Sequence, residues 1–169
     1  MIKAGILNVT GYAGLEIARL LYGHPDIEIA GVTGRSAAGK RLPEVYPHLW
    51  PLDLPITAEL TESVDIIASA LPHAAAAEQL LPYIEASVPV VDVSADFRLR
   101  RVEEYEAAYK TTHPAPHLLP GAVFGLPELH REELRDAKLT GAPGCHSTGV
   151  ILAMAPAIAA GLIEPNIIA

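Results

Sequence analysis

The sequence predicts an α/β fold with a doubly wound, mostly parallel sheet of the Rossmann type. Apolar segments of strand length alternate along the chain with segments that repeat apolar residues at helical spacing. The strand-like segments carry few polar residues, which is typical of strands covered on both faces. A turn with two glycines follows the first of them and precedes a helical segment. In this fold ligands bind beyond the carboxyl ends of the strands.

The first elements are expected between residues 3 and 41. Lys3–Leu7 predicts a strand, and Leu15–His24 repeats apolar residues at helical spacing. Pro25 ends that helix because proline lacks the N–H that a helix needs. The apolar run Ile27–Thr33 predicts the second strand, and residues 34–41 predict a loop.

The middle of the chain begins with a proline-rich stretch. Pro43–Pro55 holds four prolines around a tryptophan, which predicts irregular structure at the surface. Val64–Leu71 then reads as a continuous apolar strand, and the next residue is a proline that ends it. An alanine-rich helix is expected over His73–Ala86, and another strand over Pro89–Val93.

The last third of the chain repeats the alternation. Arg101–Lys110 predicts a charged helix and Thr112–Gly121 a loop. Glu128–Ala137 predicts a further helix, followed by a short strand over Lys138–Thr140. The last helix is expected over Thr148–Leu162, introduced by a Pro-Gly-Cys turn.

The composition excludes several classes of protein. Half of the residues are hydrophobic and 19% are charged, which is too apolar for a disordered chain. The net charge of −8 argues against nucleic acid or an anionic membrane as the main partner. A single cysteine excludes a disulfide framework and a multi-cysteine metal site, and it fits a cytoplasmic protein. The longest apolar run, residues 149–163, is too short for a membrane span and predicts a buried helix.

The end of the chain predicts a second domain. Pro165–Ala169 reads as an apolar strand, and such a strand needs neighbours to bury it. We therefore expect the chain to be the front part of a longer protein. Residues 1–145 form the cofactor-binding domain in this interpretation, and residues 146–169 begin a substrate domain whose remainder is absent.

The turn Asn8-x-x-Gly11-x-x-Gly14 lies where a dinucleotide-binding turn is expected. Gly11 allows backbone N–H groups to approach a pyrophosphate, and Gly14 allows close packing of helix on strand. The N-terminus of the following helix attracts phosphate. Asn8 replaces the usual first glycine and tolerates left-handed backbone. The alternative is a tight turn that binds no ligand.

The loop after the second strand indicates which nicotinamide cofactor is bound. An acidic residue there would bind a ribose 2′-hydroxyl, but this loop has none. Arg35 and Ser36 instead suit a 2′-phosphate, so NADP(H) is predicted. Lys40 and Arg41 are interpreted as exposed charges of the same loop.

Cys145 is the candidate nucleophile. It follows Gly144 and begins the last helix, where the positive end of the helix favours a thiolate. His146 is poorly placed as its base, because neighbouring helical residues point in different directions. The N–H groups of His146 and Ser147 suit an oxyanion instead. The alternative for a lone cysteine is a small buried hydrophobe.

No general base is evident among the other histidines. Four of them lie in predicted loops or on a charged helix, and solvated side chains are expected for all four. These are His48, His113, His117 and His130.

Taken together, these features resemble the N-acetyl-γ-glutamyl-phosphate reductases of arginine biosynthesis. Six segments carry the resemblance, in family order and spacing: Thr10–Gly14, Arg35–Lys40, Leu71–His73, Asp92–Leu99, Phe124–Leu129 and Pro143–Cys145. The resemblance implies NADPH-dependent reduction of an acyl phosphate. Cys145 would expel phosphate to form a thioester, which then accepts hydride and leaves as the semialdehyde.

The resemblance also implies a role for individual residues. Those expected to cradle the pyrophosphate are Thr10, Gly11, Tyr12, Ala13 and Gly14. Arg35 and Ser36 would meet the 2′-phosphate, and Pro72 and Ser94 would lie near the nicotinamide end of the cleft. Asp96 and Arg98 would shape the loop above it. Arg98 is either a contact to the substrate's carboxylate or phosphate or a structural ion pair, and Gly144 is a second candidate substrate contact.

Some features depart from the family pattern. Asn8, Ala142 and the pair His146-Ser147 replace residues that are common in the family. The family continues into a second domain that supplies a catalytic histidine, arginines for the substrate and contacts of a homo-oligomer. The resemblance therefore implies that the 169 residues alone would not catalyse the reaction.

Three other interpretations stay open. A sister enzyme acting on aminoadipyl phosphate in lysine synthesis would use the same nucleophile. Aspartate-semialdehyde dehydrogenase shares the architecture, but its motifs around the cysteine fit less well. A non-catalytic NADP-binding module would keep the fold without the reaction.

Overall fold

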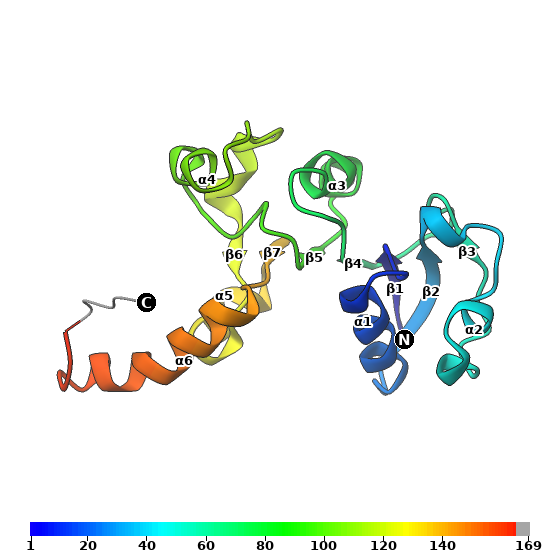
Figure 1. Ribbon diagram of the computed structural model, residues 1–169, viewed down its shortest axis with the longest axis horizontal. Helices are drawn as coiled ribbons and strands as arrows, with labels where there is room; N and C mark the ends of the chain where they lie inside the picture. The colour runs from blue at the N-terminus through cyan, green and yellow to red at the C-terminus, as the bar shows by residue number, and fades with distance from the viewer. Residues whose placement is uncertain (165–169) are drawn as a thin grey trace.

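A computed structural model describes residues 1–164 and contains one parallel sheet with helices around it (Figure 1). The strand order is β3-β2-β1-β4-β5-β7-β6, and every neighbouring pair is parallel. The strands are β1 Ile2–Leu7, β2 Ile27–Thr33, β3 Ile56–Thr57, β4 Ile66–Ser69, β5 Val90–Asp92, β6 Val123–Phe124 and β7 Leu139–Gly141. The doubly wound parallel sheet predicted from the sequence is therefore confirmed.

Six α-helices connect or follow these strands. They are α1 Tyr12–Tyr22, α2 Leu42–Val45, α3 Ala76–Glu85, α4 Val102–Tyr109, α5 Pro127–Arg135 and α6 Cys145–Ala159. Short 3-10 turns lie at Arg35–Ala37, Pro47–Leu49 and Pro116–Gly121. None of the helices within residues 1–164 is long and apolar enough to cross a membrane.

Two cores form on the two faces of the sheet. Ile6 and Leu7 point to opposite faces because side chains alternate along a strand. Ile6 packs with Ala18 of α1 and with the segment that follows β2. Leu7 packs with Leu80 of α3 and with residues near β5 and β7. This division into two cores is the packing expected of a doubly wound sheet.

The cover of the sheet is not complete on the α1 side. Ile66, Ala68, Val91 and Val93 are only half-buried there, and they line an apolar cavity next to α1. The sequence predicted cover on both faces, and within the described residues this cover is partial on the α1 side. Helix α1 packs mainly on β1 and β2, and its side chains Ile17, Leu20 and Leu21 only border the cavity over β4 and β5.

The proline-rich stretch is more regular than predicted. It contains α2 and a 3-10 turn, and it buries Leu42, Leu49 and Leu52 against the α1 core. Trp50 stays at the surface with 73% of its area exposed. The prolines fit because Pro43 and Pro47 occupy the first positions of their helical turns, where no N–H is needed.

The last helix differs from the prediction in extent and in burial. It begins at Cys145, as expected for the candidate nucleophile, but it ends at Ala159 instead of Leu162, and none of its residues is buried. Figure 1 shows α6 running away from the sheet, and its apolar side chains are at most half-buried within residues 1–164. The buried helix predicted over residues 149–163 is therefore wrong for the part described. The strand predicted over Pro165–Ala169 lies outside the described residues.

The register of the strands brings distant turns to one edge. Leu7 pairs with Ser69, Ser69 with Asp92, and Asp92 with Gly141. These four residues end β1, β4, β5 and β7, so the turns after the four strands share the carboxyl edge. The chain order changes direction between β1 and β4, which is where a doubly wound sheet binds its ligand.

Candidate cofactor and catalytic site

The turn after β1 has the backbone shape that the sequence predicts. Asn8 has a φ of 63°, in the left-handed region that asparagine tolerates. Its side-chain amide donates to the Ala70 carbonyl over 2.8 Å, and its N–H donates to Thr33 Oγ1 over 3.2 Å. Asn8 thus joins the end of β1 to β2 and β4. A glycine in its place would keep the backbone bond to Thr33 but would lose the side-chain bond to Ala70.

The two glycines meet different requirements. A Cβ on Gly14 would lie 2.2 Å from the Asn8 carbonyl oxygen, so only glycine lets α1 pack this closely on β1. A Cβ on Gly11 would meet no protein atom closer than 3.4 Å, so protein packing alone does not require a glycine there. Gly11 is the N-cap of α1 and provides no side-chain cap. The first N–H groups of α1 therefore suit a phosphate, as a bound dinucleotide requires.

The remaining residues of this turn are open to a ligand. Tyr12 is 93% exposed and Ala13 is also exposed. The backbone of Thr10 is fixed by a hydrogen bond, because the Tyr46 hydroxyl donates to its carbonyl over 2.7 Å. Tyr46 belongs to the proline-rich stretch, so that stretch supports the candidate site. No local motif marks Tyr46 for this role, and sequence reasoning missed it.

Arg35 and Ser36 lie beside the glycine turn. The Ser36 hydroxyl donates to Thr10 Oγ1 over 3.4 Å. Arg35 donates to Gln79 of α3 over 3.3 Å. Both residues line a cavity of about 360 Å³ together with Asn8, Pro72 and Gln79. The structure therefore brings four of the residues predicted from the sequence, Asn8, Arg35, Ser36 and Pro72, into one place.

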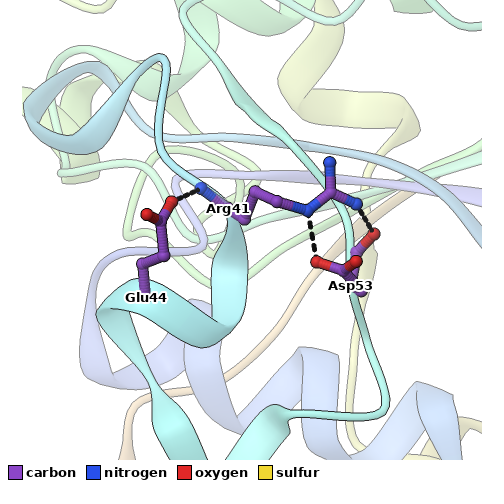
Figure 2. Close-up of polar contacts among 3 residues, drawn as sticks. All are labelled: Arg41, Glu44 and Asp53. Carbon is purple, nitrogen blue, oxygen red and sulfur yellow. Dashed lines mark hydrogen bonds and ion pairs between the residues drawn. The ribbon is translucent and has the colours of Figure 1, made fainter.

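Arg41 is engaged elsewhere. Figure 2 shows its guanidinium paired with the side chain and the carbonyl of Asp53, while its N–H donates to Glu44. These contacts close the proline-rich stretch on itself. Arg41 is therefore an exposed loop charge with a structural partner, consistent with the prediction that excluded it from the cofactor site.

Ser94 lies at the same edge, but its side chain faces inward. It is 6% exposed, and its hydroxyl donates to Asp92 while accepting the N–H of Asp96 over 3.1 Å. The other oxygen of Asp92 accepts the Ser69 hydroxyl over 2.9 Å. Burial raises the pKa of Asp92, and the two hydroxyls offset part of that rise. Only the backbone of Ser94 is left to approach a ligand.

Asp96 has a structural role that the sequence did not reveal. Its carboxylate accepts the N–H groups of Ala74 and Ala77, over 2.8 and 3.0 Å, at the start of α3. It also accepts the Tyr105 hydroxyl over 2.9 Å, and burial together with this bond raises the pKa of Tyr105. Asp96 therefore caps α3 from 19 to 22 residues away, and no local capping pattern could predict this.

His113 is not solvated, which corrects the prediction for it. It is 2% exposed, its Nε2 lies 2.8 Å from the Asp96 carbonyl, and its Nδ1 accepts the Ala115 N–H over 3.0 Å. Since Nδ1 accepts a hydrogen bond, Nε2 is the ring nitrogen that donates to the Asp96 carbonyl. His48 and His117 are exposed as predicted, and His130 is half-buried beside Glu133.

Cys145 is an exposed free thiol at the first position of α6. Gly144 is the N-cap, and its carbonyl accepts the hydroxyls of Ser147 and Thr148, each over 2.9 Å. These bonds stabilise the first turn of α6, which carries the thiol. The position excludes the alternative of a small buried hydrophobe within the described structure.

Arg98 holds the loop that carries Cys145. Its Nε donates to the Ala142 carbonyl and its Nη2 to the Val93 carbonyl, each over 2.7 Å. The structural role predicted as an ion pair is therefore a clamp on two backbone carbonyls. Nη1 lies on the Gly144 side, 3.3 Å from the position of a Cβ on that glycine. A side chain at Gly144 would press on the clamp.

The distance between the two parts of the site follows from the sheet. The glycine turn follows β1 and the Cys145 loop follows β7, three strand positions away. Three inter-strand spacings of ~4.8 Å amount to about 14 Å along the carboxyl edge. An extended dinucleotide can follow this edge from the glycine turn toward the thiol. Within residues 1–164, no group of three His, Cys, Asp or Glu side chains is arranged to hold a metal ion.

Comparison with known proteins shows the family to which the chain belongs. Residues 3–137 match the family described as "Semialdehyde dehydrogenase, NAD binding domain". A protein of Dehalococcoides mccartyi named N-acetyl-gamma-glutamyl-phosphate reductase is 52% identical over 98% of this chain and 49% of its own length. A protein of Thermomicrobium roseum named "Putative [LysW]-L-2-aminoadipate 6-phosphate reductase" is 46% identical over 97% of this chain and 47% of its own length. The chain spans about half the length of these relatives.

Solved structures show the same fold. Aspartate semialdehyde dehydrogenase from Candida albicans, determined with NADP, matches with a TM-score of 0.64 over 96% of this chain and 48% of that chain. The corresponding enzyme from Vibrio cholerae matches with a TM-score of 0.63 over 95% of this chain and 47% of that chain. Both are 17% identical in sequence, so the likeness extends to the fold alone.

Proposed function

Since the chain belongs to the semialdehyde dehydrogenase family, whose nicotinamide-dinucleotide-binding domain it carries, we propose that the protein is an NADPH-dependent acyl-phosphate reductase. Its substrate is N-acetyl-γ-glutamyl phosphate and its product N-acetylglutamate semialdehyde, a step of arginine biosynthesis. The observation that carries this proposal is an exposed thiol at a helix N-terminus on the same sheet edge as a glycine turn. The reductase names of several relatives support the substrate.

The proposed reaction has two steps, acylation of Cys145 and reduction of the thioester that results. The Cys145 thiolate adds to the acyl carbon, the bond from that carbon to the phosphate oxygen breaks, and phosphate leaves. The N–H groups of His146 and Ser147 stabilise the oxyanion that forms. NADPH supplies the hydride that reduces the resulting thioester. The carbon–sulfur bond then breaks, so the aldehyde leaves and the Cys145 thiolate is restored.

The residues at the carboxyl edge of the sheet that would bind the cofactor are assigned from their positions. The turn from Thr10 to Gly14 and the first N–H groups of α1 bind the pyrophosphate. Arg35 and Ser36 bind the 2′-phosphate, which selects NADP(H) over NAD(H). Pro72 and the backbone of Ser94 lie along the path toward Cys145.

The rest of the assembly is proposed from the resemblance. A small-molecule acyl phosphate is the partner, with no nucleic acid and no membrane. The protein is cytoplasmic, and at full length it forms a homo-oligomer. A second domain supplies the histidine that acts as acid and base. Arg98 holds the Cys145 loop and presents Nη1 to the substrate beside Gly144.

A second substrate has a specific observation in its favour. The Thermomicrobium roseum relative is named for an aminoadipate 6-phosphate. The two acyl phosphates require the same attack by Cys145, so the described residues serve either one.

Turnover tests the proposal. The full-length protein should oxidise NADPH and release one phosphate per NADPH when N-acetyl-γ-glutamyl phosphate is supplied, and Cys145→Ser should abolish both signals. Faster turnover of the aminoadipyl phosphate would assign the second substrate. NADPH binding without turnover of either, together with a Cys145 thiol that iodoacetamide alkylates no faster than free cysteine, would indicate a non-catalytic module.

A further inference from the structure

We propose that Gln79 is a positioning residue that holds Arg35 toward the 2′-phosphate of NADP(H), and that it can do so because its side chain is uncharged. This inference rests on the proposed use of Arg35 for cofactor choice. Arg35 lies in the turn after β2 and Gln79 lies on α3, 44 residues later. Arg35 Nη2 donates to Gln79 Oε1 over 3.3 Å, and both side chains line the cavity beside Asn8.

A second hydrogen bond determines the orientation of the Gln79 amide. Its Nε2 donates to the Ala75 carbonyl over 3.3 Å, one helical turn earlier. Because the nitrogen faces Ala75, the oxygen faces Arg35. Ala75 is the N-cap of α3, and Asp96 anchors this helix end through its bonds to Ala74 and Ala77. The amide is therefore held by a fixed part of the domain.

An amide suits this position better than a carboxylate. Glutamate has no N–H to offer the Ala75 carbonyl, so it would lose the bond that orients the side chain. It would also pair with Arg35 as an anion and repel a neighbouring phosphate. Glutamine uses one of the five N–H donors of Arg35 and leaves its positive charge unneutralised. The remaining donors suit a bidentate contact with phosphate.

The hydrogen bond between Arg35 and Gln79 contributes little to the stability of the fold, so it can be removed by mutation without unfolding the protein. Arg35 is exposed and Gln79 is half-buried, and hydrogen bonds between such side chains add little to stability. Substitutions at Gln79 should therefore leave the protein folded while changing how Arg35 meets the cofactor.

The test is a pair of dissociation constants, for NADPH and for NADH, measured by fluorescence titration of the full-length protein. Gln79→Glu should weaken NADPH binding about tenfold, because it adds repulsion and neutralises Arg35, and should leave NADH within about twofold. Gln79→Met keeps the side-chain length without either hydrogen bond and should weaken NADPH about threefold. The double variant Glu78→Gln/Gln79→Glu keeps the net charge and should match Gln79→Glu, since only the position of the carboxylate differs.

The outcomes separate this inference from the proposed function. If Arg35→Ala removes the preference for NADPH while Gln79→Glu leaves it unchanged, the role of Gln79 is contradicted and the cofactor assignment stands. If the double variant recovers the affinity of the wild type, net charge rather than position explains the loss, and the inference is again contradicted. If the wild type binds NADPH and NADH equally, the cofactor assignment and the role of Gln79 both fail.

Discussion

Gly14 packs α1 against the end of β1 so closely that no side chain fits between them. Gly14→Ala would place a methyl group 2.2 Å from the Asn8 carbonyl oxygen. We expect the free energy of unfolding to fall by about 2–3 kcal/mol and the dinucleotide affinity to fall with it. Gly121→Ala is the control, because a Cβ there meets no atom within 4 Å. Urea denaturation of both variants checks this, and equal stabilities would contradict the close packing.

Arg35 decides the cofactor in this account. Arg35→Ala should weaken NADPH binding about tenfold or more and NADH much less, because only NADPH carries the 2′-phosphate. Arg41→Ala is a suitable control, since Arg41 is paired with Asp53 outside the cavity. Isothermal titration of each variant with both cofactors measures the difference. Equal losses of NADPH and NADH would remove the reason for choosing NADP(H).

Residue roles were predictable where they depend on neighbours in sequence. Asn8 and Cys145 stand in local patterns, and the structure gives Asn8 its left-handed backbone and Cys145 its exposed helix start. Asp96, His113 and Gln79 were not predictable in this way. Their partners lie on other elements, and only the folded chain brings them together.

Among the elements, α3 depends on a cap that it does not contain. Asp96→Ala would leave the Ala77 N–H and the buried Tyr105 hydroxyl without their acceptor. We expect a loss of about 3 kcal/mol in unfolding free energy, because unpaired buried donors are costly. Tyr105→Phe removes one bond and leaves the cap in place, so it should cost about 1 kcal/mol. Similar stabilities of the two variants would contradict the capping role.

The end of β5 makes stability depend on pH. Burial raises the pKa of Asp92 in the folded state, so its stabilising contribution is complete below the unfolded pKa of about 3.9 and is lost as pH rises through the folded value. Asp92→Asn does not ionise. The variant should therefore gain stability relative to the wild type between about pH 4 and about pH 7. Urea denaturation at both values measures this, and a constant or opposite difference would contradict it.

The existence of the longer elements followed from periodicity, whereas the shortest elements did not. β3 and β6 have two residues each, too few for any repeat to show. α2 was hidden because Pro43 resembles a loop residue, although it lies in the first turn of the helix, where proline is tolerated. The apolar pattern alone placed the start of α6 at Thr148, whereas the Pro-Gly-Cys turn correctly indicated a start at Cys145 after the N-cap Gly144.

At the scale of the whole molecule, the sheet register assembles the candidate site. Four strand ends in register place the glycine turn and the Cys145 loop on one edge, about three strand spacings apart. Strand–helix alternation predicted this edge. The exposure of α6 could not be predicted, because apolar residues indicate that a surface needs cover but not what covers it.

The central claim is that Cys145 forms a covalent acyl intermediate. The most direct measurement is intact-protein mass spectrometry of the full-length protein mixed with N-acetyl-γ-glutamyl phosphate in the absence of NADPH. We predict one released phosphate and one acyl adduct per chain, mapped to Cys145 by peptide analysis and absent from Cys145→Ser. Phosphate release that is equally fast in Cys145→Ser, with no adduct on Cys145 in the wild type, would contradict the account.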